Sequence, residues 1–298
     1  MDEFALIREV VRHLADRAQG PWVTLGPGDD AAVMRQSPGT DAVASIDTLV
    51  ADVHFPASAS PFHIGYRALM VSLSDLAAMA AVPRYVLVAL TLPAAEVAWV
   101  GELAKGMAAA ARACDTYICG GNVARGPLSI TVSVHGEVPA GKAVTRSGAQ
   151  PGDTLYVSGP LGLAAACVRQ QSYVVQDELN ALQRAYFLPQ ARFDLLEVLR
   201  ADAHACIDIS DGLLADAQHL AEASGVEINI FRKALALAQG VTLQDVLHGG
   251  DDYQILATAA VPLAGMVSLG EVRSAQTGAG VSLDSVLQQP QGYNHFAS

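Results

Sequence analysis

The sequence predicts a mixed α and β protein with two domains. Helical and strand patterns alternate along the chain, and its 298 residues are enough for two ordinary domains with sizeable cores. Hydrophobic residues make up 51% and charged residues 16%, which is typical of globular proteins. A stretch rich in Gly, Pro and Ala interrupts the pattern at 139–153. We therefore expect an N-terminal domain over 1–138 and a C-terminal domain over 139–298.

The first domain is predicted to begin with a helix. Residues 1–17 space their apolar side chains as an amphipathic helix does, and acidic residues at the start distinguish it from a signal peptide. Ser60 as a cap and Pro61 in the first turn begin a long helix that ends near Pro83. The strand over 116–122 is expected to run into a glycine turn at "CGGN". The other expected elements are a helix over 94–114, a short strand and loop over 21–30, and strands over 41–50 (ending near Asp47), 84–93 and 128–138.

The second domain is predicted to contain shorter elements of both kinds. Alternating or continuous apolar runs indicate strands, and apolar residues at helical spacing indicate helices between them. The expected strands cover 154–159, 205–210, 226–231, 253–260 and 265–272. The expected helices cover 162–171 and 212–224, with two more that end near Leu199 and short ones between the strands 226–231 and 253–260.

Charge and cysteine content exclude several classes of protein. The formal net charge is −12, whereas general nucleic-acid binders and binders of anionic membranes need a basic surface. The sequence has no apolar run of the roughly 18 residues that a membrane span requires. Its four cysteines form no CxxC pair and are expected to be reduced core or strand thiols. We expect a cytoplasmic protein without nucleic-acid or membrane partners.

One glycine motif near the N-terminus imitates a dinucleotide-binding loop. Gly26, Gly28 and Ala31 satisfy the pattern G-x-G-x-x-G/A, and Asp47 follows at a distance that suits a ribose contact. The pattern requires a helix that starts at the glycines, and Pro38 comes too early for one. Two adjacent carboxylates would also occupy the place of the pyrophosphate. We therefore reject this interpretation.

A second near match lies at the end of the first domain. Gly136, Gly141 and Lys142 follow the spacing of the phosphate loop G-x-x-x-x-G-K-[ST]. Ala143 stands where a hydroxyl group must bind magnesium, and Pro139 argues against a following helix. We interpret this stretch as part of the link between the domains.

The remaining chemistry is a set of aspartates in loops, at strand ends or within apolar sequence. A carboxylate flanked by isoleucines, as in "CIDIS", is not typical of a solvated surface, and buried carboxylates must pair or bind metal. Only 18 residues are Lys or Arg, so metal is the expected partner, and hard oxygen ligands favour Mg²⁺. The alternative for each aspartate is a cap or a turn, which fits Asp75 and Asp208 poorly. The set comprises Asp29, Asp30, Asp47, Asp75, Asp208, Asp211, Asp251 and Asp252.

Several motifs in order resemble the thiamine-monophosphate kinase family over nearly the whole chain. They include "GPGDDAAV", "DTLVADVHF", "SLSDLAAMAAVP", "GGNVARGPLSITVSVHGEV", "IDISDGLLAD", "GGDDYQI" and "GYNHF". The resemblance implies a two-domain fold like that of aminoimidazole ribonucleotide synthetase. Its N-terminal α/β domain would pair its sheet across a homodimer, and its C-terminal α+β domain would have a sheet covered by helices.

The resemblance also implies a reaction and its residues. ATP and thiamine monophosphate would give ADP and thiamine diphosphate by direct transfer, with several Mg²⁺ ions. The residues that match magnesium positions are Asp30, Ser45, Asp47, Asp75, Asp208 and Asp211, with Ile46 through its backbone carbonyl and Asn122 through its amide. Those that match ATP positions are Cys114, Gly121, Asn122, Arg146 and Ser210. Those that match substrate positions are His54, Asp251 and Tyr293, whose ring suits a cationic thiazolium.

The chain departs from the family pattern at some of these positions. Asn122 stands where Asp is common, Ile46 where Thr is common, and Cys114 where an aromatic residue is common. Asp251 is shorter than the usual Glu, and the segment after residue 255 looks shortened. Two alternatives therefore stay open. One is another ATP-using enzyme of the same superfamily, and the other is a binder of nucleotide or thiamine phosphate that has lost turnover.

Overall fold

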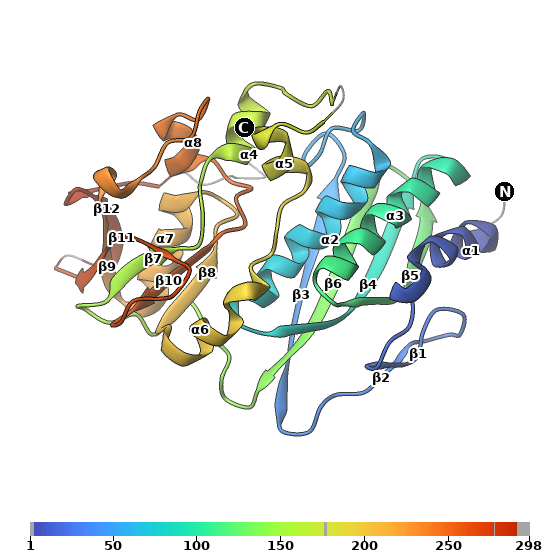
Figure 1. The fold of residues 1–298 in the computed structure, drawn as a ribbon, viewed down its shortest axis with the longest axis horizontal. Coiled ribbons are helices and arrows are strands. Elements are labelled where there is room, and N and C mark those ends of the chain that lie inside the picture. Colours follow the sequence, from blue (N-terminus) through green and yellow to red (C-terminus); the bar gives the residue numbers. More distant parts are fainter. Residues whose placement is uncertain (1–2, 176–177, 277, 291–298) are drawn as a thin grey trace. The chain divides into compact units, whose positions relative to one another are not determined.

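The chain divides into two compact units in the computed structural model, which describes residues 3–175, 178–276 and 278–290 (Figure 1). The first unit is Met1–Leu76 with Ala81–Gly141, and the second is Ala77–Ala80 with Lys142–Ser298. Both contain helices and strands, so the predicted mixed α and β class is confirmed.

The first unit is built on a four-stranded sheet in the order β3-β6-β4-β5. β3 pairs antiparallel with β6, β6 antiparallel with β4, and β4 parallel with β5. Figure 1 shows α2 and α3 together on one face of this sheet, with α1 beside α3. The bounds are α1 Glu3–Leu14, η1 Ala15–Arg17, β1 Val23–Leu25, β2 Val33–Met34, β3 Thr40–Val50, α2 Pro61–Ala78, β4 Val82–Leu92, α3 Val97–Ala113, β5 Tyr117–Arg125 and β6 Ser129–Pro139.

Alternation along the strands explains why one face of this sheet is covered. On β6 the side chains of Ile130, Val132 and Val134 are all fully buried, whereas the residues between them are half-buried. A strand points successive side chains to opposite faces, so these three lie on a single face. β3 shows the same period, with exposed Ile46 between half-buried Ser45 and Asp47. The two polar residues therefore lie on the same face as each other, opposite Ile46.

The glycine turn expected at "CGGN" is wrong. Gly120 and Gly121 lie inside β5, which continues to Arg125. A side chain on Gly121 would overlap the carbonyl oxygen of Val88 on the neighbouring strand β4, so the glycine permits close strand packing instead of a turn. The strand expected to end near Asp47 likewise continues to Val50, which leaves Asp47 within β3.

The second unit is built on a seven-stranded sheet in the order β13-β12-β9-β11-β7-β10-β8. Helix α7 packs against strands β8, β9 and β12, and its leucines enter a large apolar core with the inner residues of those strands. The bounds are β7 Thr154–Val157, α4 Leu163–Arg169, α5 Ala181–Phe187, η2 Phe193–Leu195, α6 Leu196–Asp202, β8 Ala205–Asp208, α7 Leu213–Ser224, β9 Val226–Ile230, η3 Arg232–Ala234, α8 Leu243–His248, β10 Ile255–Ala259, β11 Val267–Ser274, β12 Gly280–Leu283 and β13 Val286–Leu287.

Both rejected glycine motifs lack the helix that they would need. A bridge, a bend and the short strand β2 follow Gly26 and Gly28, and an irregular segment without helix follows Lys142. Strands β12 and β13 were not predicted.

In the described part of the chain, none of the helices has both the length and the apolar character needed to cross a bilayer.

Candidate functional site

Two carboxylates of the first unit, Asp47 on strand β3 and Asp75 on helix α2, lie near each other. The hydroxyl of Ser45 on β3 donates a hydrogen bond to Oδ2 of Asp75 on α2, at 2.5 Å. Asp47 lies two residues along β3, on the same face as Ser45. Burial and the nearby Asp75 charge raise the pKa of Asp47, while a hydrogen bond from Ser72 lowers it. The two carboxylates therefore repel one another in a partly desolvated place, which is where a cation would be most stabilising.

Two more predicted residues of the first unit lie in turns. Asp30 is exposed in the loop between β1 and β2, and its N–H donates to Asp29 Oδ1 at 2.8 Å. His54 follows β3, and its Nδ1 accepts the N–H of Val50 at 3.0 Å. That bond requires an unprotonated Nδ1, so the neutral ring carries its proton on Nε2.

Gly121 and Asn122 lie at the opposite edge of the sheet from Asp47. Strand register pairs Asp47 with Val132, Val132 with Val88, and Val88 with Gly121. Asp47 and Gly121 are therefore three strand spacings apart, which is about 14 Å. Asn122 is the next residue on β5, so it points to the other face of the sheet. One copy of the first unit does not bring Asn122 to the Asp47–Asp75 pair.

Cys114 and Ile46 have contrasting surroundings. Cys114 is buried after the end of α3, and its Sγ lies 3.5 Å from Sδ of Met70 on α2. Burial raises the pKa of its thiol to about 12, so this cysteine is an unreactive core thiol. Ile46 is 64% exposed, and its apolar side chain leaves only the backbone carbonyl as a possible ligand.

In the second unit two backbone-paired loops carry the predicted aspartates. Asp208 ends β8 and is buried, and residues 209–212 lead from it into α7. Ser210 O accepts the N–H of Asp251 at 2.9 Å, and Ile209 O accepts the N–H of Tyr253 at 2.8 Å. The loops therefore form one assembly that brings Asp208, Ser210, Asp211 and Asp251 together.

The second loop adopts an uncommon backbone conformation. Asp251 has a φ of 68° and Tyr253 a φ of 50°, both in the left-handed region that residues other than glycine seldom occupy. The Tyr253 hydroxyl donates to Asp251 Oδ1 at 2.9 Å, which ties the two strained residues to each other. Such strain persists only where the surrounding structure holds it, and it is common at functional sites.

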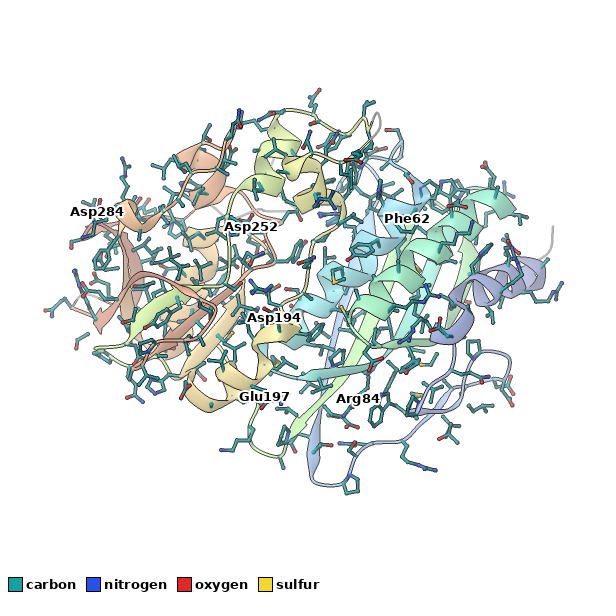
Figure 2. The ribbon with its side chains drawn as sticks, in the orientation of Figure 1. Phe62, Arg84, Asp194, Glu197, Asp252 and Asp284 are labelled. Atoms are coloured by element: carbon teal, nitrogen blue, oxygen red, sulfur yellow. The ribbon has the colours of Figure 1, made fainter. Side chains whose placement is uncertain are left out.

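Two further carboxylates support these loops: Asp216, which is buried and had no predicted role, and Asp252, which is half-buried and belonged to the predicted aspartate set. Asp216 Oδ2 accepts the N–H groups of Ser210, Asp211 and Gly212 at 3.0–3.1 Å. Burial raises the pKa of Asp216 to about 7, with the charges of Asp208 and Asp211 adding to the rise and backbone N–H bonds opposing it. Asp252, labelled in Figure 2, accepts the N–H of Gly162 with both oxygens, and burial raises its pKa well above the usual range.

Helical periodicity was the signal that could have found Asp216. In α7 the buried apolar residues Leu213, Ala217 and Leu220 recur at helical spacing, and Asp216 falls on the same face. A carboxylate at an apolar position of an amphipathic helix has to have partners inside the protein. For Asp252 the sequence offered only its place in "GGDD".

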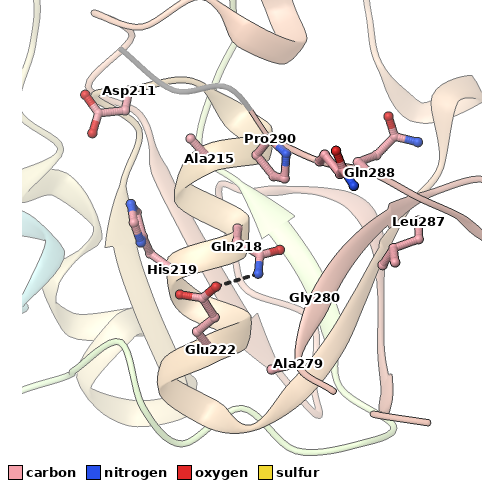
Figure 3. Close-up of a pocket in the computed structure, with 11 residues that line it drawn as sticks. Asp211, Ala215, Gln218, His219, Glu222, Ala279, Gly280, Leu287, Gln288 and Pro290 are labelled. Carbon is pink, nitrogen blue, oxygen red and sulfur yellow. Dashed lines mark hydrogen bonds between the residues drawn. The ribbon is translucent and has the colours of Figure 1, made fainter. Parts of the chain in front are cut away.

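A groove of about 580 Å³ runs along α7 from the predicted ligand Asp211 (Figure 3). Gln218, His219 and Glu222 of the same helix line it, and Gly280 lies on its other side. The Gln218 side chain donates to Glu222 at 2.6 Å and accepts the N–H of Val281 at 3.0 Å, so its amide is engaged within the protein. Asp211 is half-buried, and Asp216 is not among the residues that line the groove.

The last two predicted residues lie outside these clusters. The side chain of Arg146 is exposed in the segment before β7, and its carbonyl accepts the Ser224 hydroxyl at 3.0 Å. Among the described residues Arg146 has no ion-pair partner, so its exposed guanidinium can reach an anionic ligand without breaking such a pair. Tyr293 falls outside the described residues.

The donor set is compatible with Mg²⁺ bound together with phosphate. Within the described ranges, no three His, Cys, Asp or Glu side chains converge on a closed metal centre. Mg²⁺ does not need one, because it is usually held by one or two carboxylates, substrate phosphates and water. Asp47, Asp75 and Ser45 offer hard oxygen donors of this kind. The two loops of the second unit offer a further set, including Asp208 and Asp211.

The two halves match a single class of protein. Residues 28–138 match the family model of AIR synthase related protein, N-terminal domain, and residues 150–261 match the model of its C-terminal domain. The sheets and carboxylate-bearing loops described above thus define an AIR-synthase-related protein with both domains.

The relatives narrow this class further. The chain is 38% identical to the thiamine-monophosphate kinase of Salmonella typhimurium over 268 aligned residues. The alignment covers 86% of this chain and 82% of the relative. The chain belongs to the thiamine-monophosphate kinase family, so the resemblance found in the sequence is confirmed.

Solved structures agree with this assignment. The crystal structure of thiamine-monophosphate kinase from Stenotrophomonas maltophilia K279a has a TM-score of 0.85 and 35% identity, over 97% of this chain and 98% of that chain. The structure of AaThiL complexed with AMPPCP and TMP has a TM-score of 0.81 and 30% identity, over 99% of this chain and 97% of that chain. The two-domain fold class implied by the resemblance is confirmed.

Proposed function

We propose that this protein transfers the γ-phosphoryl group of ATP to thiamine monophosphate, giving ADP and thiamine diphosphate. The observation that carries the proposal is the likeness, over 99% of the chain, to a family member complexed with AMPPCP and TMP. AMPPCP is an ATP analogue that cannot transfer its γ-phosphoryl group, so that complex is of the kind expected for a kinase and its two substrates. The carboxylate arrangement supports the same chemistry.

The reaction does not need a strong general base. The attacking group is an oxygen of a phosphate monoester, whose second pKa near 6 leaves it largely ionised at neutral pH. Phosphoryl transfer then depends on positioning and on neutralising the charge of the phosphates. Bound Mg²⁺ would supply that neutralisation. Asp47 and Asp75, which already face one another across β3 and α2, would hold it in the first unit.

The other roles follow the family motifs and the surroundings of each residue. We assign to magnesium Asp30, Ser45, Ile46 (backbone), Asp47, Asp75, Asn122, Asp208 and Asp211. We assign to ATP Cys114, Gly121, Asn122, Arg146 and Ser210, and to thiamine monophosphate His54, Asp251 and Tyr293. Arg146 is the best supported of the ATP residues, because its charged group is exposed. For Cys114 only its backbone is an available contact, since the thiol faces Met70.

A homodimer would resolve the separation of Asn122 from Asp47. The two residues lie at opposite edges and on opposite faces of one sheet, so a ligand set that includes both requires a second copy. The 11-residue edge strand β3 supports pairing, because its outer edge has no strand partner among the described residues. Long unpaired edges are ready templates for another strand. Ile46, 64% exposed on the uncovered face, would be buried by such pairing.

A mixed dimer tests whether two copies share the site. Asp75→Asn and Asn122→Ala are each expected to be inactive as homodimers. Co-expressed with different affinity tags and purified as a heterodimer, they should regain about half of the wild-type turnover, since one of the two shared sites would be intact. A purified heterodimer as inactive as its parents would contradict sharing, and a monomeric mass by light scattering would contradict the dimer.

The turnover assay tests the function itself. Purified protein with ATP, Mg²⁺ and thiamine monophosphate is expected to form thiamine diphosphate and ADP in equal amounts. Chelation of Mg²⁺ or omission of thiamine monophosphate should abolish both products, because transfer needs the metal and the acceptor. If ADP appears only with a different acceptor, the protein is another enzyme of the superfamily. If the substrates bind without turnover, the alternative hypothesis is correct, and the protein is a binder that has lost its activity.

A cytoplasmic location fits this function. The substrate ATP is a cytoplasmic metabolite, and all four cysteines are buried and free, as expected of a protein in a reducing compartment.

A further inference from the structure

The turn that carries Ser210 and Asp211 is organised around one buried carboxylate. Three successive N–H groups, those of Ser210, Asp211 and Gly212, converge on Oδ2 of Asp216. Successive backbone N–H groups that converge in this way form a nest for an anion. In this protein the anion is a side chain of the same unit, with 2% of its surface exposed. The nest is therefore already filled and cannot receive a phosphate of ATP.

The position of Asp216 differs from that of an ordinary helix cap. A capping residue precedes the helix and binds N–H groups of the first turn. Asp216 lies inside α7, in its first turn, and reaches back to groups that precede the helix. Its contribution to the helix itself is therefore small, and its main effect is on the conformation of residues 210–212.

This conformation is passed on to the second loop. A side chain on Gly212, whose φ is 114°, would come within 2.9 Å of the carbonyl carbon of His248. A side chain on Gly250 would overlap the carbonyl oxygen of Ser210. The Asp251 N–H is bonded to that same carbonyl. With backbones in such close contact, a displaced turn would displace Asp251 as well as Asp211.

We propose that Asp216 is a positioning residue, which holds the turn 209–212 so that Asp208, Ser210 and Asp211 can bind the metal–nucleotide complex. The proposal rests on the proposed function of these residues as metal and ATP ligands. Asp216 touches neither metal nor substrate and acts through three backbone N–H groups. Its removal should therefore weaken metal binding more than it weakens the fold.

The test is metal binding by Asp216→Asn, measured without turnover. Mn²⁺ titrated into the protein with AMPPCP, followed by electron paramagnetic resonance, is expected to bind roughly 10- to 100-fold more weakly than in the wild type, the range found when groups that support metal ligands are removed. The Mg²⁺ concentration that gives half-maximal activity should rise in parallel. Asparagine keeps one oxygen acceptor but loses the charge that strengthens the three bonds.

Asp245→Asn is the matched control. Asp245 is also buried, also lies in the first turn of a helix, and accepts the Thr242 N–H at 2.8 Å while pairing with Arg169. This variant should lose thermal stability with unchanged Mn²⁺ affinity, since among the described residues its side chain bonds only Thr242 and Arg169, which are not predicted ligands.

Two results would overturn the proposal. One is a folded Asp216→Asn protein with wild-type Mn²⁺ affinity, and the other is an equal loss of affinity in Asp245→Asn. If the asparagine variant does not fold, Asp216→Glu takes its place. Glutamate keeps the charge but displaces the carboxylate, so the same loss of Mn²⁺ affinity is expected. Wild-type protein that binds Mn²⁺ and makes no thiamine diphosphate would contradict the proposed function alone.

Discussion

Replacement of Asp75 by asparagine is expected to lower the turnover of thiamine monophosphate by at least about 100-fold, which corresponds to roughly 3 kcal/mol of transition-state stabilisation. The substitution removes one of the two charges that face each other between α2 and β3. The asparagine oxygen can still accept the Ser45 hydroxyl, so the packing of helix on strand should persist. Relief of the repulsion with Asp47 should leave thermal stability unchanged or higher.

The measurement is the steady-state rate at saturating ATP and Mg²⁺, together with a thermal melt. Asp115→Asn is a suitable control, because Asp115 is an exposed carboxylate of the same unit whose partner is Arg17, and its loss should leave the rate unchanged. An Asp75→Asn enzyme with normal rate and normal Mg²⁺ dependence would show that this aspartate has no part in the site.

Replacement of Gly106 by alanine is expected to destabilise the protein by roughly 3 kcal/mol or more, as over-packing of a rigid contact does. Helices α2 and α3 approach each other through two glycines. A Cβ on Gly106 would overlap the carbonyl oxygen of Phe62, labelled in Figure 2, and one on Gly65 would overlap the carbonyl oxygen of Leu103. Backbone atoms cannot rotate away, so the helices would have to separate. The gain of about 1 kcal/mol in helix propensity is too small to offset this.

Gly101→Ala in the same helix is the matched control. There the new methyl group would meet the side-chain end of His13, at 2.8 Å from Nε2, and that end can move. Its stability should therefore stay near that of the wild type or rise. Urea unfolding of the three proteins measures the difference. An unchanged midpoint for Gly106→Ala would mean that the two helices are not in close backbone contact.

Local patterns in the sequence were sufficient to find most elements and several site positions. Asp75 was expected inside a helix and Asp208 at a strand end, and both lie there. These assignments depend on spacing within some 10 to 18 residues, which helical and strand periodicity reports directly. The absence of a helix after Gly26 and Gly28 was likewise readable from the nearby Pro38.

The errors arose where distant parts of the chain meet. Gly120 and Gly121 suggested a turn by themselves, but β4 packs so closely that the strand needs a residue without a side chain. Strand order, which places Asn122 and Asp47 at opposite edges of the sheet, was equally beyond what local spacing could predict. The unpredicted strands β12 and β13 are short, and β12 depends on its parallel pairing with β9.

The sequence by itself determined the mixed class, the family and the residue types of the site, because these follow from local spacing and from ordered motifs. Only the tertiary structure decided which carboxylates meet. It joined Ser45 to Asp75, paired the loop of Ser210 with that of Asp251, and gave Asp216 its three N–H partners. The physical reason is that strand order, register and loop pairing are contacts between distant segments, which no local pattern encodes.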